Sequence, residues 1–241
     1  MDKSLNSLSP SPLMDVASVF FDFGGTLARP EPPGEVLFCE ACQLLGFQVV
    51  PCDLLRVIAE VDTKIDYPLP ITRRQEADFF AYGNMMALQE LGFKATLSHG
   101  WFIHHYIRDR LHYSKFHDTD TVLSHLKGAG FKLGMISNAV PSHRDRISSL
   151  GLERYFDTIV LSGEVGYEKP DPEIFKIALR NLHVKPEESI HVGDSYHADV
   201  EGAHRIGITP VLLDRADRYH DVDCITVKDL MEFQELMHIF K

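Results

Sequence analysis

The stretch from residue 19 to residue 27, VFFDFGGTL, constrains this chain more than any other segment. Three apolar residues run directly into the carboxylate of Asp22, and a glycine pair, Gly24 and Gly25, follows. Such an apolar run is typical of a strand that is buried on both faces of a parallel sheet. Glycines let the backbone approach a ligand closely, and open parallel sheets bind ligands beyond the carboxyl ends of their strands. The stretch therefore predicts that Asp22 is a nucleophile or a metal ligand.

The composition allows a sizeable core and argues against nucleic acid as a partner. The chain has 241 residues, of which 44% are hydrophobic, and this suits one domain or one domain with an inserted module. Its formal net charge is −11, from 24 basic and 35 acidic residues, whereas sequence-independent nucleic-acid binding needs clustered Lys and Arg. An anionic substrate is still compatible with this charge, because a divalent cation can reverse the local field.

The sequence also indicates a protein that is located in a reducing compartment and does not contact membranes. No apolar run approaches the roughly 20 residues that span a bilayer. No signal peptide precedes the four cysteines, so we expect free thiols and a cytoplasmic protein. Residues 1–16 are expected to form a flexible tail, because their beginning is rich in Ser, Pro, Leu and Asn. We expect a monomer or a homodimer.

Two kinds of pattern divide the rest of the chain. Helical periodicity dominates from about residue 35 to residue 112, with candidate helices over 35–46, from Asp53, from Thr72 to residue 92, and over 101–111. From residue 118 onward, helix and strand patterns alternate, and this implies right-handed crossovers and a parallel sheet. We therefore predict an α/β, doubly wound, Rossmann-like parallel sheet from residues 17–30 and 115–241, with an all-helical cap inserted at residues 31–114.

The ends of the predicted strands and the loops after them carry polar residues in a regular order, and all of them would open on one edge of the sheet. These residues are Asp22 and Thr26, Ser137 and Asn138, Lys169, and Asp194 and Asp199. This set combines a carboxylate, hydroxyls, a lysine and a carboxylate pair. Groups of these types that converge at one edge suit a metal-bound phosphoryl group.

The residue types suggest a role for each charged group. Asp22 can attack phosphorus and form an aspartyl-phosphate, which divides one hard displacement into two easier ones. Mg²⁺ prefers oxygen ligands and keeps several waters, so Asp22, a backbone carbonyl and Asp194 are its expected protein ligands. Asp199 is expected to bind the metal directly or to orient one of its waters. Lys169 is expected to neutralise Asp22 and the incoming phosphate.

Hydrogen-bond donors complete the predicted site. The hydroxyls of Ser137 and Thr26 are expected to donate to the non-bridging oxygens of the phosphoryl group. Backbone amides near Gly24 and Gly25 are expected to do the same, and Asn138 is expected beside the substrate.

These motifs and their order resemble those of the haloacid dehalogenase superfamily, in its phosphatase-like branch with a helical, C1-type cap. Residues 22–27 (DFGGTL) resemble the first motif, Ser137 and Asn138 the second, Lys169 in VGYEKPDP the third, and the stretch from Asp194 to Asp199 the fourth. The resemblance runs from about residue 17 over nearly the whole chain. It implies Mg²⁺-dependent hydrolysis of a small phosphorylated metabolite, with the backbone carbonyl of Gly24 as a metal ligand.

The chain departs from that pattern at position 24, where the phosphatases of the family have a second aspartate. That aspartate protonates the leaving oxygen and later activates water, and general acid–base catalysis is typically worth ~10²–10⁴-fold. Gly24 therefore predicts slow turnover of alkyl phosphates unless another group compensates, and the candidates in the sequence are His191, His197 and Glu31.

Other functions remain open beside this one. A non-catalytic relative that binds a phosphorylated ligand or a protein partner is favoured by Gly24. A phosphoacceptor signalling domain is disfavoured by the large insert. A phosphonatase would need a cap lysine such as Lys64 or Lys94, and the context of neither marks it. A dehalogenase is disfavoured because that branch has an aromatic residue at position 24.

Overall fold

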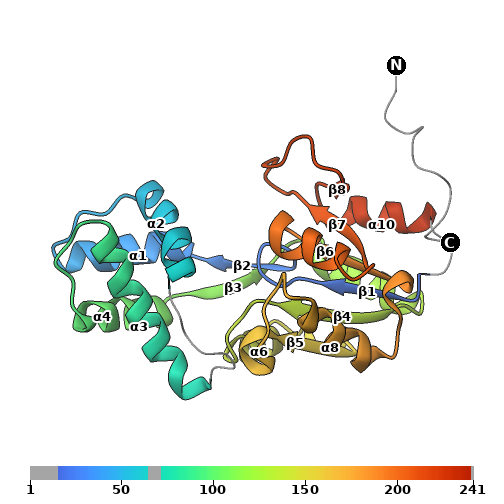
Figure 1. Cartoon of the computed structure of the whole chain (residues 1–241), viewed down its shortest axis with the longest axis horizontal. Helices are drawn as coiled ribbons and strands as arrows, with labels where there is room; N and C mark the ends of the chain where they lie inside the picture. The colour runs from blue at the N-terminus through green and yellow to red at the C-terminus, as the bar shows by residue number, and fades with distance from the viewer. Residues whose placement is uncertain (1–15, 65–71, 240–241) are drawn as a thin grey trace.

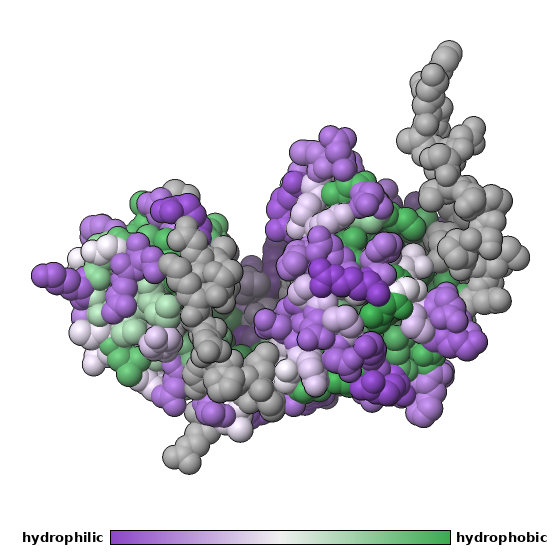
Figure 2. Space-filling model, viewed as in Figure 1, coloured by the Kyte–Doolittle hydropathy of each residue, from purple (hydrophilic) through white to green (hydrophobic). Residues whose placement is uncertain are grey.

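The structure is a computed structural model that describes residues 16–64 and 72–239. The predicted tail of residues 1–16 lies outside this part of the chain, apart from its last residue. Figure 1 shows a larger α/β lobe and a smaller helical lobe, joined by a two-stranded ribbon. In the space-filling view, the surface is hollowed between the two lobes (Figure 2). Among the described helices, none is both long and apolar enough to cross a membrane.

The larger lobe is built on a six-stranded sheet in which every neighbouring pair is parallel. Its strand order is β5 (Thr158–Leu161), β4 (Lys132–Ser137), β1 (Ser18–Phe21), β6 (Ser189–Gly193), β7 (Thr209–Leu213) and β8 (Ile225–Val227). The predicted doubly wound α/β fold is thus confirmed. The sequence analysis missed β8, a strand of three residues with only one buried position.

Helices cover both faces of the sheet, and this explains the apolar run at residues 19–21. Val19 and Phe21 pack in one cluster with residues of α5 (Thr119–Gly128), α6 (His143–Ser149) and α10 (Leu230–Ile239). Phe20 points to the other face and packs with α8 (Pro172–Leu182) and α9 (Gly202–His204). Successive side chains of a strand point to opposite faces, so a strand between two helical layers must be apolar at every position.

Short elements complete this lobe. They are the helix α7 (Ser162–Val165), the 3₁₀ turns at Glu153–Tyr155 and Pro186–Glu188, and a π-helical turn at Tyr196–Glu201.

Among its described residues, the smaller lobe contains four helices that pack around a cluster of their own. They are α1 (Gly34–Leu44), α2 (Pro51–Lys64), α3 (Arg73–Glu90) and α4 (Leu97–Arg108). Thr72 begins α3 with a capping box, as predicted. The helix expected at 101–111 instead begins after Thr96. It crosses α3 so closely that a Cβ atom on Gly100 would lie 1.9 Å from the carbonyl oxygen of Ala81.

The ribbon consists of β2 (Ala28–Glu31) and β3 (His112–Lys115), which pair antiparallel. The sequence analysis missed both strands, because β2 contains a proline and β3 (HYSK) has no apolar alternation. Proline is tolerated in such a strand because one edge of a two-stranded ribbon needs no ladder hydrogen bonds. The insert is therefore helical in its body, but it leaves and rejoins the core through strands.

A second connection between the lobes lies at the amino-terminal end of α3. Arg73 forms a bidentate ion pair with Asp145 of α6, and one of its two contacts measures 2.9 Å. The buried carboxylate of Glu76 accepts a hydrogen bond from the backbone amide of Ser142 at 2.8 Å. The helical lobe is thus attached to the residues that begin α6.

The close crossing of α3 and α4 leads to a stability prediction. Gly100→Ala should lower the free energy of unfolding by about 1–3 kcal/mol, because the added methyl group meets backbone and not a movable side chain. Gly128→Ala is the matched control, since a Cβ atom there meets nothing within 4 Å, and it should change stability by less than about 1 kcal/mol. Urea unfolding followed by circular dichroism measures both, and equal effects would contradict the prediction.

Candidate active site

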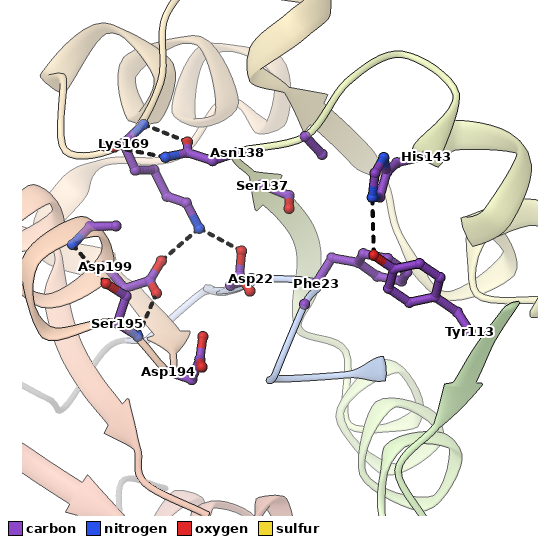
Figure 3. A pocket seen from close by; sticks show the side chains of 13 residues that line it. Asp22, Phe23, Tyr113, Ser137, Asn138, His143, Lys169, Asp194, Ser195 and Asp199 are labelled. Carbon is purple, nitrogen blue, oxygen red and sulfur yellow. Dashed lines mark hydrogen bonds and ion pairs between the residues drawn. The ribbon is translucent and has the colours of Figure 1, made fainter. Parts of the chain in front are cut away.

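A cavity of about 230 Å³ opens at the carboxyl edge of the sheet. Asp22 follows β1, Ser137 ends β4, and Asp194 follows β6, so three neighbouring strands deliver their polar ends to it. Seven of the predicted site residues line the cavity: Asp22, Gly24, Ser137, Asn138, Lys169, Asp194 and Asp199. Figure 3 shows the side chains of these residues other than Gly24.

Lys169 occupies the centre of the charged cluster. Its ammonium group is buried and donates to an oxygen of Asp22 and to an oxygen of Asp199, both at 2.6 Å. Burial works to lower the pKa of Lys169, but the carboxylates of Asp199 and Asp22 outweigh it and raise that pKa. Lys169 is therefore a fixed cation at neutral pH.

Asn138 holds the backbone on either side of that lysine. Its side-chain oxygen accepts from the amide of Lys169 at 2.6 Å, and its side-chain nitrogen donates to the carbonyl of Lys169 at 2.8 Å. The side chain that we expected beside the substrate thus has its amide group engaged in positioning Lys169.

Asp199 forms the inner wall of the cluster. One carboxylate oxygen contacts both Lys169 and Nε2 of His191, the latter at 2.8 Å, and the other accepts from the amide of Ser195 at 3.1 Å. Burial acts to raise the pKa of Asp199, but Lys169 and His191 lower it well below its usual range. Both oxygens thus have protein partners, which suits the orienting role considered for Asp199.

A glycine makes this arrangement sterically feasible. A Cβ atom on Gly193 would lie 2.2 Å from Cγ of Asp199, so only glycine lets β6 lie this close to the carboxylate. The same holds at Gly25, which has a φ of +77° and where a Cβ atom would lie 2.4 Å from a carboxylate oxygen of Asp194.

Asp22 and Asp194 bring further negative charge to the cavity. Burial raises the pKa of Asp22, while Lys169 opposes that rise. Burial and the nearby carboxylates of Asp22 and Asp199 raise the pKa of Asp194 to about 6, although Arg218 donates to it at 3.1 Å. Three carboxylates share this region, so an additional cation would be stabilised there.

The residues present fit Mg²⁺ by the chemistry of their donor atoms. Asp22, Asp194 and the backbone at Gly24 supply oxygen alone. Within the described residues, no group of three or more His, Cys, Asp or Glu side chains could hold a metal ion by itself. Mg²⁺ is usually bound through one or two carboxylates and keeps several waters, so two carboxylates and a backbone carbonyl are a sufficient set of protein ligands.

The structure corrects the prediction for Thr26. Its side chain is fully buried and does not line the cavity. The chain folds back after Gly25, whose amide donates to the carbonyl of Ala28 at 2.9 Å, and the buried Thr26 hydroxyl has no hydrogen-bond partner among the described residues. Gly25 does not line the cavity either, because it packs behind Asp194.

The candidates for a substitute acid lie elsewhere. His191 is buried behind Asp199, His197 bonds Glu201 at 2.9 Å on the exposed surface, and Glu31 lies on β2. None of the three lines the cavity. Of the two cap lysines, Lys94 is exposed and outside the cavity, and the side chain of Lys64 lies outside the described part of the structure.

Tyr113 and His143 line the cavity instead, and the sequence analysis missed both. The ring of Tyr113 stacks on Phe23 with centroids 5.3 Å apart, and its hydroxyl lies 3.3 Å from Nε2 of His143 (Figure 3). Burial and the charge of Arg146 lower the pKa of His143 to about 4, so its imidazole is neutral at pH 7. The available signal was weak, because Tyr113 reaches the site only through the pairing of β2 with β3.

The fold and this site define an α/β protein with a carboxylate–lysine centre at the carboxyl edge of a parallel sheet. The chain belongs to the haloacid dehalogenase-like hydrolase family, whose model matches residues 16–207. This confirms the predicted family.

Two curated relatives are phosphatases. The chain is 35% identical over 131 residues to glyceraldehyde 3-phosphate phosphatase of Methanothermobacter thermautotrophicus, over 51% of this chain and 58% of that protein. It is also 35% identical over 131 residues to phosphoserine phosphatase of Thermus thermophilus, over 53% of each. The matched region thus spans only about half the length of these relatives.

A solved structure supports the fold over nearly the whole chain. The HAD-hydrolase YfnB from Bacillus subtilis, bound to magnesium, superposes with a TM-score of 0.71 at 19% identity, over 94% of this chain and 99% of that one.

The buried lysine leads to a second stability prediction. Lys169→Met should lower the free energy of unfolding by about 3–5 kcal/mol, because it leaves the buried carboxylates of Asp22 and Asp199 without their cation. Lys176→Met is the control, since Lys176 is half exposed in its ion pair with Glu173, and it should cost less than about 1 kcal/mol. Urea unfolding at pH 7 without divalent cations compares the two, and a loss for Lys169→Met no larger than that of the control would refute the argument.

Proposed function

We propose that this chain hydrolyses small phosphate monoesters through a phosphorylated Asp22, with Mg²⁺ as its cofactor. The observation that carries the proposal is the 2.6 Å contact between the carboxylate of Asp22 and the buried ammonium of Lys169, inside a cavity at the carboxyl edge of the sheet. A carboxylate fixed in this way is a positioned nucleophile.

In the first step, an oxygen of Asp22 attacks phosphorus and the bond from phosphorus to the leaving oxygen breaks. Lys169 holds Oδ1 of Asp22, so Oδ2 is the oxygen that we assign to the attack. The Lys169 cation balances charge on the phosphoryl oxygens, and the Ser137 hydroxyl, which lines the cavity, donates to one of them. In the second step, water attacks the phosphorus and releases phosphate from Asp22.

Asp22, Asp194 and the Gly24 carbonyl would hold the metal. When bound, Mg²⁺ supplies positive charge that neutralises the phosphate among three carboxylates. Asp199 then keeps Lys169 in place, because its carboxylate is held by His191 and the amide of Ser195.

The substrate class follows from the size of the cavity and from the relatives. A cavity of about 230 Å³ suits a small molecule. The two relatives named above act on glyceraldehyde 3-phosphate and phosphoserine. We therefore propose three-carbon phosphate monoesters as the first compounds to test.

A second candidate function is binding of a phosphorylated ligand without turnover. The observation in its favour is Gly24, which leaves the position beyond Asp22 without a carboxyl group. The two candidates differ on p-nitrophenyl phosphate, whose good leaving group hardly needs an acid: an enzyme turns it over and a binding module does not.

The nucleophile can be tested directly. Asp22→Asn should lower hydrolysis of p-nitrophenyl phosphate in Mg²⁺ by more than about 10³-fold, because an amide cannot form the phosphorylated intermediate. Asp221→Asn makes the same chemical change at an exposed position with a φ of 57°, which Asn tolerates, and should leave the rate unchanged. Release of phosphate measures both rates. Full activity of Asp22→Asn would overturn the mechanism.

The missing carboxyl group can be restored. Gly24→Asp should raise turnover of glycerol 3-phosphate by up to about 10-fold, because it adds a further proton donor where a Cβ atom meets nothing within 4 Å. Gly24→Ala fills the same space without an acid and should give no increase. If the two variants behave alike in a phosphate-release assay, acid catalysis at position 24 does not limit the reaction.

A further inference from the structure

Tyr113 brings a phenol group to the same cavity that Gly24 lines without a carboxyl group. Phe23 separates Asp22 from Gly24 in the sequence, and the ring of Tyr113 stacks on Phe23 at 5.3 Å with an interplanar angle of 28°. This packing places the Tyr113 ring next to the nucleophile segment. Tyr113 also lines the same cavity as Asp22 and Lys169.

We propose that the Tyr113 hydroxyl is the general acid and base of this site, in the role that a carboxyl group at position 24 would fill. The assignment rests on the proposed phosphatase function. Its geometric basis is that Tyr113 and His143 bring proton-carrying groups to the cavity, whereas His191, His197 and Glu31 do not.

The surroundings of the hydroxyl support a proton donor. It lies 3.3 Å from Nε2 of His143, and the guanidinium of Arg146 lies 3.2 Å from the same nitrogen and 5.1 Å from the centre of the Tyr113 ring. The hydroxyl and an N–H group of Arg146 thus face the same ring nitrogen, and the phenolic proton can turn about its C–O bond toward a leaving oxygen when substrate is bound. Burial raises the pKa of Tyr113 and the charge of Arg146 opposes that rise, so the phenol carries its proton at neutral pH.

The proton balance closes over the two steps. As Asp22 attacks phosphorus and the bond to the leaving oxygen breaks, that oxygen takes the proton of Tyr113 and leaves as an alcohol. The resulting phenolate is stabilised by the Arg146 cation. As water then attacks the phosphorylated Asp22, its proton returns to Tyr113, and phosphate leaves. His143 and Arg146 are positioning residues in this scheme.

The test compares leaving groups, because an acid matters most when the leaving oxygen is strongly basic. Tyr113→Phe keeps the ring on Phe23 and removes only the hydroxyl. With Mg²⁺ present, it should lower turnover of glycerol 3-phosphate by about 10²-fold and that of p-nitrophenyl phosphate by less than about threefold. Tyr155→Phe removes a hydroxyl that bonds Asp120 at 3.1 Å, outside the cavity, and should change neither rate.

Further variants separate the chemical role of the Tyr113 hydroxyl from its role in packing. Gly24→Asp in the Tyr113→Phe background should restore turnover of glycerol 3-phosphate, because a carboxyl group would then supply the proton. Arg146→Met should cause the same selective loss as Tyr113→Phe, and Arg146→Lys should retain most of the alkyl phosphate activity, since it keeps the cation.

The outcomes distinguish the two proposals. Equal losses on both substrates, or no loss, in Tyr113→Phe would overturn the assignment of Tyr113 and leave Asp22 chemistry standing. A wild-type protein that hydrolyses neither substrate in Mg²⁺ would overturn the proposed function itself.

Discussion

The buried contact of Lys169 with Asp22 and Asp199 is the interaction on which the site depends. One ammonium group lies 2.6 Å from each of two carboxylates, and water is almost excluded from all three. Removing a charge from water costs several kcal/mol, so such a cluster persists only when each member is paired and hydrogen-bonded. The remaining contacts supply that support: Asn138 holds the backbone of Lys169, while His191 and the amide of Ser195 hold Asp199. These contacts fix Lys169, and Lys169 in turn holds the carboxylate of Asp22 at the end of β1.

The sequence predicted the fold and the charged centre because both follow from short segments. An apolar run ending in Asp22 identifies a central strand, and the polar residues after β4 and β6 must meet it at the same edge of a parallel sheet. The sequence did not show that Thr26 would be buried outside the cavity lining, because this depends on how the turn after Gly25 folds back onto Ala28. Tyr113 was missed because its position depends on the pairing of residues 28–31 with residues 112–115, which lie on either side of an 80-residue insert. No local pattern encodes such a pairing when one strand contains proline and the other is polar.

The ribbon therefore does more than connect the lobes. It begins directly after the nucleophile segment and ends at Lys115, so the turn after Asp22 and the ring of Tyr113 belong to one local structure. A carboxyl group at position 24 would come from the first arm of this structure, and the Tyr113 hydroxyl comes from the second. The same small region can thus present a proton donor to the cavity from either arm, and loss of one need not leave the region without a donor.

The helical lobe is connected to the same wall of the cavity from a second direction. Glu76 of α3 accepts from the amide of Ser142, and Arg73 pairs with Asp145, so α3 holds both sides of His143 at the beginning of α6. His143 in turn contacts the hydroxyl of Tyr113, which the ribbon positions. The helical lobe is therefore connected to Tyr113 through β3 and to the residues around His143 through α3. Lys169, Asp22 and Asp199, by contrast, are joined to one another by hydrogen bonds within the core. The structure thus separates the Lys169 cluster, which the core holds, from a wall of the cavity that is connected to the helical lobe.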